Sequence, residues 1–166
     1  MNPFVALGDM RMRPEESNTR DGHNADLYPG RTYRFYTGLS VYPFGYGLSY
    51  TSWDYSVEIA ATKIVNSNQN DKNSVSVIAV NVSNTGSMDG SHSVLLFHMG
   101  PNAGRSGNPI KSLIGFEKVY VLAGRTQLVE FNVEKWMLSQ EAGTHIFIAG
   151  PSMKYTCRPK YAIYWN

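Results

Sequence analysis

The chain from residue 53 onward is a succession of short apolar–polar alternations, each ended by turn-forming residues. The first places Trp53, Tyr55, Val57 and Ile59 at every second position. Successive side chains of a strand point to opposite faces, so this period indicates a strand with one buried face. Segments of the same character follow at residues 74–82, 92–99, 113–121, 126–133, 143–149 and 160–165.

Turn signals separate these predicted strands at short intervals, as in Asn84-Thr85-Gly86 and Ala123-Gly124. About seven short strands with frequent turns predict an all-β fold, an antiparallel β-sandwich. Within residues 74–82 two alternating sets compete for the core face: Val75, Val77 and Ala79, or Ile78, Val80 and Val82. Residues 134–140 are the one segment for which we expect a short helix.

A segment of a different kind, residues 28–53, precedes the strands. Aromatic side chains occupy nine of its 26 positions, with glycines and prolines between them and no helical or strand period. Burying one such ring contributes roughly 2 kcal/mol, so nine rings would contribute on the order of 18 kcal/mol before entropy is counted. That exceeds the net stability of an ordinary domain, about 5–15 kcal/mol. We therefore interpret this segment as a strap that buries its rings against a neighbouring surface.

Composition narrows the classes of partner. The net charge of +2 does not indicate binding to nucleic acid or to an anionic membrane, and no apolar run is long enough to span a bilayer. The first residues lack the basic region and cleavage site of a signal peptide. Cys157 is the only cysteine and the four histidines have no metal-ligand spacing. We therefore expect no internal disulfide, no metal site and no cofactor.

The aromatic strap carries a recognisable pattern. PGRTYRFYTG at residues 29–38 and VYPFGYGLSYT at residues 41–51 resemble a signature of glycoside hydrolase family 3. DMRMRP at residues 9–14 is similar to the β-xylosidase branch of that family. Residues 80–97 and 113–124 resemble the fibronectin type III-like domain that closes those enzymes. The resemblance implies an immunoglobulin or fibronectin type III-like sandwich over residues 52–166, preceded by an irregular strap over residues 1–51.

The same resemblance bears on catalysis. Retaining glycosidases need two carboxylates about 5–5.5 Å apart. In the family the catalytic aspartate lies on a barrel and the acid/base glutamate on a second α/β domain, both upstream of the segments that this chain matches. Glu58, Glu117 and Glu130 occupy outward positions of predicted strands, so we interpret them as solvated charges. We expect no catalytic residues in this chain and no activity from it alone.

The function implied is that of a non-catalytic, structural C-terminal region of a β-xylosidase- or β-glucosidase-like exo-glycosidase that degrades xylan or β-glucan. Its partners would be the catalytic α/β domains, with carbohydrate as a further ligand. Residues expected at the domain interface are Arg31, Tyr33, Phe35, Tyr36, Tyr42, Phe44 and Tyr46. Several of the rings among Tyr33, Phe35, Tyr36, Tyr42, Phe44 and Tyr46 should be unusually exposed in the chain alone. Leu48, Tyr50 and Trp53 should be the best buried.

Alternatives stay open at this point. The chain could be a stand-alone module that binds carbohydrate or protein through its aromatic residues, or a truncated gene product. Family members are commonly secreted, but the sequence shows no export signal and leaves the cellular location open. Asn81-Val82-Ser83 matches a glycosylation sequon, within a predicted strand.

Overall fold

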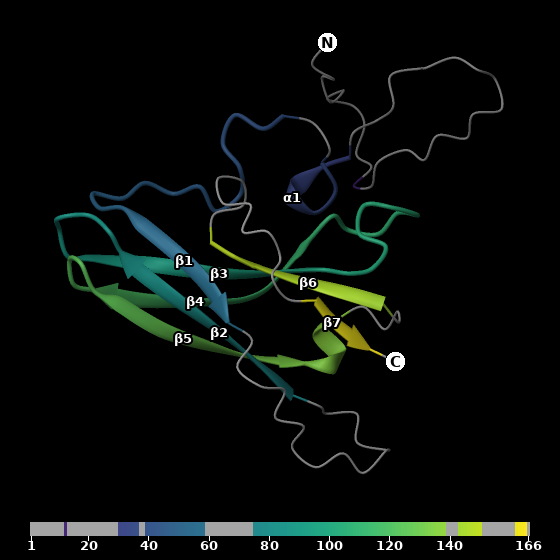
Figure 1. Ribbon diagram of the computed structural model, residues 1–166. Helices are drawn as coiled ribbons and strands as arrows, with labels where there is room; N and C mark the ends of the chain where they lie inside the picture. Colours follow the sequence, from purple (N-terminus) through teal and green to yellow (C-terminus); the bar gives the residue numbers. More distant parts are fainter. Residues whose placement is uncertain are drawn as a thin grey trace.

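Two β-sheets pack face to face in this computed structural model, which describes residues 12, 30–36, 39–58, 75–138, 143–150 and 162–165 (Figure 1). Tyr28, Ile59 and Cys157 lie outside these residues. The elements in chain order are α1 (Thr32–Phe35), β1 (Trp53–Glu58), β2 (Val75–Asn84), β3 (Gly90–Met99), β4 (Ser112–Val121), β5 (Thr126–Glu134), the 3-10 helix η1 (Lys135–Met137), β6 (Gly143–Ala149) and β7 (Ala162–Trp165).

The strands form one three-stranded sheet in the order β1-β2-β5 and one four-stranded sheet in the order β4-β3-β6-β7. Every pairing is antiparallel. This confirms the all-β sandwich and places seven strands close to their predicted ranges. The helix expected over 134–140 is shorter: β5 continues to Glu134, and a single 3-10 turn then carries Leu138 into the core.

The core lies between the sheets, and alternating residues of each strand supply it. In β5 the buried residues are Val129, Phe131 and Val133, with exposed residues between them. In β2 the second predicted set is correct, because Ile78, Val80 and Val82 are each 0% exposed. Such a period-2 pattern is what a sheet with one buried face requires.

β3 is buried on both faces at one point. Leu96, Phe97 and His98 are consecutive and all buried, although successive side chains point to opposite faces. Leu96 belongs to the core between the sheets. Phe97 points the other way, where the rings of Tyr33 and Phe44 pack edge-on against it, with centroids 5.9 and 6.2 Å away. The strap therefore covers the outer face of the four-stranded sheet.

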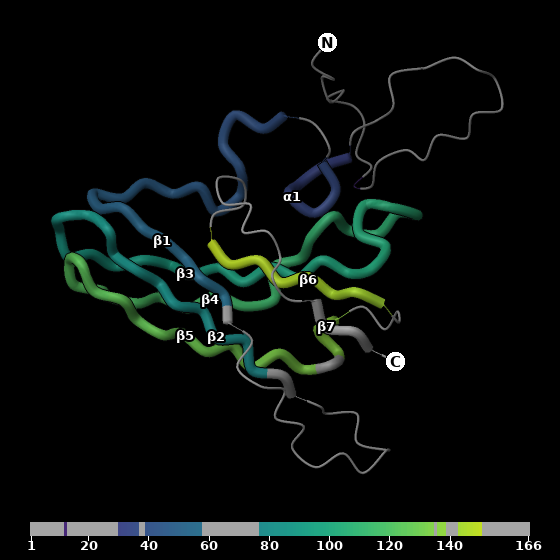
Figure 2. Tube along the Cα trace, viewed as in Figure 1, coloured from purple at the N-terminus to yellow at the C-terminus, as the bar shows by residue number. Residues whose placement is uncertain are grey.

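The described part of the strap crosses this outer face and then leaves it. α1 lies beside β3 and the start of β4, and the chain from residue 39 runs toward the end of the sandwich that holds the β2–β3 and β4–β5 turns (Figure 2). Gly45 allows a close approach on the way: its φ is +82°, and a Cβ there would lie 2.5 Å from Leu95 Cδ1. A side chain at this position would have to displace the Leu95 side chain, and the positive φ also favours glycine.

Candidate functional site

The seven residues predicted for a domain interface separate into two groups in the structure. Tyr33 stacks on Phe44 with ring centroids 4.2 Å apart, and Phe35 is only 8% exposed. The Tyr33 hydroxyl also accepts a hydrogen bond from the Leu113 N–H, at 3.2 Å. These contacts bind the α1 part of the strap to the four-stranded sheet. Phe35 is therefore not among the exposed rings of the strap, because it has a place in this chain's own packing.

The later rings of the strap are exposed. Tyr42, Phe44 and Tyr46 expose 71%, 45% and 48% of their surface, and Tyr42 and Tyr46 contact each other with centroids 5.2 Å apart. Tyr36 is half-buried and its hydroxyl donates to the Leu39 carbonyl at 3.4 Å. Arg31 is also half-buried. The exposure predicted for Tyr42, Phe44 and Tyr46 is confirmed.

The residues expected to be best buried behave differently from one another. Trp53 is 8% exposed, as predicted, and its indole N–H donates to the Ser49 hydroxyl at 3.0 Å. Leu48 and Tyr50 are each 96% exposed, so that prediction was wrong. Nearness to β1 along the chain does not bury these two side chains, because the strap between Gly47 and Thr51 is exposed to solvent instead of packed on a sheet. Together, the exposed apolar residues of the strap form what we call the strap face: Leu39, Val41, Tyr42, Phe44, Tyr46, Leu48 and Tyr50.

Sequence reasoning missed a second pair of exposed aromatic residues, on β4. Phe116 is 71% exposed and Tyr120 is 60% exposed, and both lie on the same side of the strand, four residues apart. Glu117 of this strand and Glu130 of β5 are also exposed, as expected for solvated charges. The strand was predicted without saying which of its side chains face solvent, because an alternating pattern alone does not decide that.

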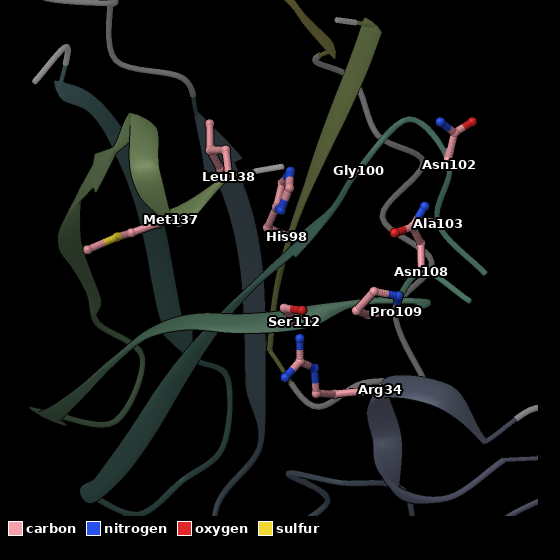
Figure 3. A pocket seen from close by; sticks show the side chains of 10 residues that line it. All are labelled: Arg34, His98, Gly100, Asn102, Ala103, Asn108, Pro109, Ser112, Met137 and Leu138. Carbon is pink, nitrogen blue, oxygen red and sulfur yellow. The ribbon is translucent and has the colours of Figure 1, made fainter. Parts of the chain in front are cut away.

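A polar pocket of about 250 Å³ lies where α1, the β3–β4 loop, the start of β4 and η1 meet (Figure 3). Arg34, Asn108 and Ser112 supply polar groups, and Met137 and Leu138 supply apolar surface. The wall is fixed to α1 by a hydrogen bond of 2.7 Å from the Ile110 N–H to the Arg34 carbonyl. The sequence did not predict this pocket, because loop conformation and strap docking are tertiary properties.

A pair of stacked histidines lies beside this pocket. His98, which lines it, approaches His145 of β6 with Nε2 and Nδ1 2.8 Å apart, and both side chains are buried. Burial, and to a lesser extent the neighbouring His145, lowers the pKa of His98 to about 4. His98 is therefore neutral near pH 7. The two residues are 47 positions apart and meet only because β3 and β6 pair.

Two other kinds of site are absent from the described residues. They hold no group of three or more histidine, cysteine, aspartate or glutamate side chains placed to bind a metal ion. Within the same part of the chain no helix has the length and apolar character needed to cross a membrane.

Comparison with known proteins gives the family. Residues 92–146 match the model of the fibronectin type III-like domain. β-D-xylosidase 1 of Arabidopsis thaliana is 40% identical over 131 residues, covering 64% of this chain and 17% of that protein. A family 3 (GH3) β-glucosidase structure from Bifidobacterium adolescentis is 26% identical with a TM-score of 0.54, covering 68% of this chain and 17% of that one. The chain is a fibronectin type III-like region of glycoside hydrolase family 3.

A β-glucosidase structure from Erythrobacter marinus supports the same conclusion, with 31% identity and a TM-score of 0.58 over 75% of this chain and 17% of that one. The curated relatives are several times longer than this family 3 region, which spans 17–19% of their length. The fibronectin type III-like match runs from within β3 into β6 and includes both histidines of the pair and one wall of the polar pocket.

Proposed function

We propose that this region is a non-catalytic, structural part of a β-xylosidase- or β-glucosidase-like exo-glycosidase, and that its strap face contacts a catalytic α/β domain of that enzyme. In this proposal residues 1–51 form the strap and residues 52–166 the sandwich. Arg31, Tyr33, Phe35 and Tyr36 lie at its anchored end, and Tyr42, Phe44 and Tyr46 make the contact.

The strap face itself carries the proposal. Seven large apolar side chains within 12 positions are exposed, and Leu39, Val41, Leu48 and Tyr50 each expose 86% or more. So many exposed apolar side chains in one short segment are unusual on the surface of a soluble monomer and are typical of an interaction surface. The strap is nevertheless fixed to the sandwich at both ends, through Tyr33 at one and Trp53 at the other. A surface held in place in this way suits a permanent contact between domains.

A binding measurement tests this interface. The chain would be titrated with the separately produced α/β domains of a relative such as the Arabidopsis xylosidase. A variant carrying Val41→Ser, Tyr42→Ser and Tyr50→Ser should bind at least about tenfold more weakly, because truncating central apolar anchors removes most of the binding energy. These residues do not cover Phe97, so the sandwich should stay folded.

The matched control changes exposed aromatic residues away from the strap. Phe116→Ser with Tyr120→Ser removes a similar amount of exposed ring surface from β4 and should leave the affinity unchanged. Equal binding by the strap variant and the wild-type chain would contradict the proposal. Binding of the chain to xylan or β-glucan instead of to the α/β domains would favour the module that binds carbohydrate by itself.

Catalysis is tested separately. The purified chain should not hydrolyse aryl β-xylosides or aryl β-glucosides, since the proposed role does not include a catalytic carboxylate pair. Turnover that disappears on replacing one acidic residue of this chain would overturn the non-catalytic assignment.

A further inference from the structure

The polar pocket is lined by one solvent-exposed cationic side chain that forms no ion pair with the described residues. Arg34 is the only lining residue with a permanent charge, and no carboxylate lines the pocket within the described part of the chain. Its guanidinium lies 5.6 Å from the ring of Phe35 and forms no ion pair with any described residue. Figure 3 shows it pointing toward Ser112, inside the pocket. A guanidinium in this position is suited to pair with a planar carboxylate through two hydrogen bonds.

Two neutral groups extend the polar side of the pocket. The Asn108 amide and the Ser112 hydroxyl form no side-chain hydrogen bond to other described residues. An amide and a hydroxyl both donate and accept, so they match the hydroxyl groups of a ligand. His98 adds no charge, since it is neutral above about pH 4 and its Nε2 already pairs with His145.

The opposite side of the pocket is apolar, and the pocket as a whole is small. Met137 and Leu138 present side chains there. Its volume of about 250 Å³ lies just below the range of about 300–1,000 Å³ that is usual for drug-sized ligands. One ring of atoms therefore suits it better than an extended chain. Hydroxyl groups on one edge, an apolar ring face and a carboxylate are together the features of a sugar acid.

We propose that this pocket binds a sugar acid, with the carboxylate on Arg34 and the ring hydroxyls on Asn108 and Ser112. The inference that the ligand carries a carboxylate follows from the pocket itself. The choice of a sugar also rests on the proposed function in glycan breakdown. The site is positioned before a ligand arrives: the Ile110 N–H binds the Arg34 carbonyl, and the Leu113 N–H binds the Tyr33 hydroxyl. These two hydrogen bonds attach α1 to the residues that flank Ser112 in the chain.

The test is an NMR titration of the full chain at constant ionic strength, which follows backbone amide signals of residues 100–113. Sodium glucuronate is the probe, and glucose and sodium acetate are the comparisons that carry only the ring or only the charge. We expect glucuronate to bind at least about tenfold more tightly than either one. Equal binding of glucose would overturn the role of the charge, and equal binding of acetate would overturn the assignment of a sugar.

Variants separate this pocket from the rest of the surface. Arg34→Gln should weaken glucuronate binding about tenfold, since hydrogen bonds to charged groups are the stronger kind, and Ser112→Ala about fivefold. Arg125→Gln changes an exposed arginine of the β4–β5 turn and should have no effect. Wild-type affinity in both pocket variants, with unchanged amide spectra elsewhere, would overturn the site. None of these outcomes depends on the strap face, so the two proposals can fail independently.

Discussion

The hydroxyl of Thr51 donates a hydrogen bond to the Asn84 Oδ1 over 2.6 Å, and so ties the end of the strap to the end of β2. The same Asn84 oxygen accepts from the Gly86 N–H, while its Nδ2 donates to the carbonyls of Met88 and Val121. The side chain is 1% exposed. One buried amide thus joins the strap, the β2–β3 turn and the end of β4.

Asn84→Ala should destabilise the fold by about 3 kcal/mol, because it leaves several buried or half-buried polar groups without a partner. Urea unfolding measures the change. Asn132→Ala, on the exposed side of β5, is the control and should cost less than about 0.5 kcal/mol. If Asn84→Ala lowered the free energy of unfolding no more than Asn132→Ala does, water would be replacing the hydrogen bonds of Asn84.

Gly115 and Phe131 set the approach of the two sheets at β4 and β5. A Cβ at residue 115 would lie 2.8 Å from Phe131 Cδ1, closer than van der Waals contact allows. Gly115→Ala should therefore cost about 1–3 kcal/mol through overpacking. In a double-mutant cycle, Phe131→Leu should recover part of this loss, and purely additive effects would contradict a direct contact.

The Tyr33–Phe44 pair shields Phe97, which is 0% exposed. Replacing both rings with alanine should expose Phe97, lower stability by about 2–4 kcal/mol and increase the binding of a fluorescent hydrophobic dye. Tyr50→Ala is the control, since that ring is 96% exposed and its loss should change neither property. Unchanged dye binding in the double variant would mean that the strap does not protect the sheet.

Acid should destabilise the sandwich through His98. Folding lowers its pKa from 6.5 to about 4, so between these pH values the unfolded chain binds a proton that the folded chain does not. Its contribution to stability is complete above about pH 6.5 and is lost as the pH falls toward 4. The melting temperature should therefore decrease across this window.

His98→Gln provides the comparison, because an amide keeps a hydrogen-bonding atom near the position of Nε2 without titrating. This variant should show a flatter dependence of melting temperature on pH. Burial also lowers the pKa of His92, which stacks on Trp53, so part of the slope should remain. An identical slope in the variant and the wild-type chain would exclude His98 as its source.

Local patterns predicted most of the sandwich. The period-2 alternation in β2 and β5 and the turn residues after Asn84 and Val121 reflect backbone geometry, which a few neighbouring residues determine. The strap signature was equally readable and led to the family. The candidate site could not be predicted from the sequence. Arg34, His98 and Ser112 belong to three separate segments, and no local pattern in one segment indicates that it contacts the others.

Sequence alone thus determined the strand positions, the turns and the presence of an aromatic strap, since each depends on residues close together in the chain. The tertiary structure decided which of two alternating sets faces the core and why Phe35 is buried while Tyr50 is exposed. It also brought His98 to His145 and Arg34 to Ser112. Those outcomes depend on which distant surfaces meet, and burial is a property of both surfaces rather than of either segment.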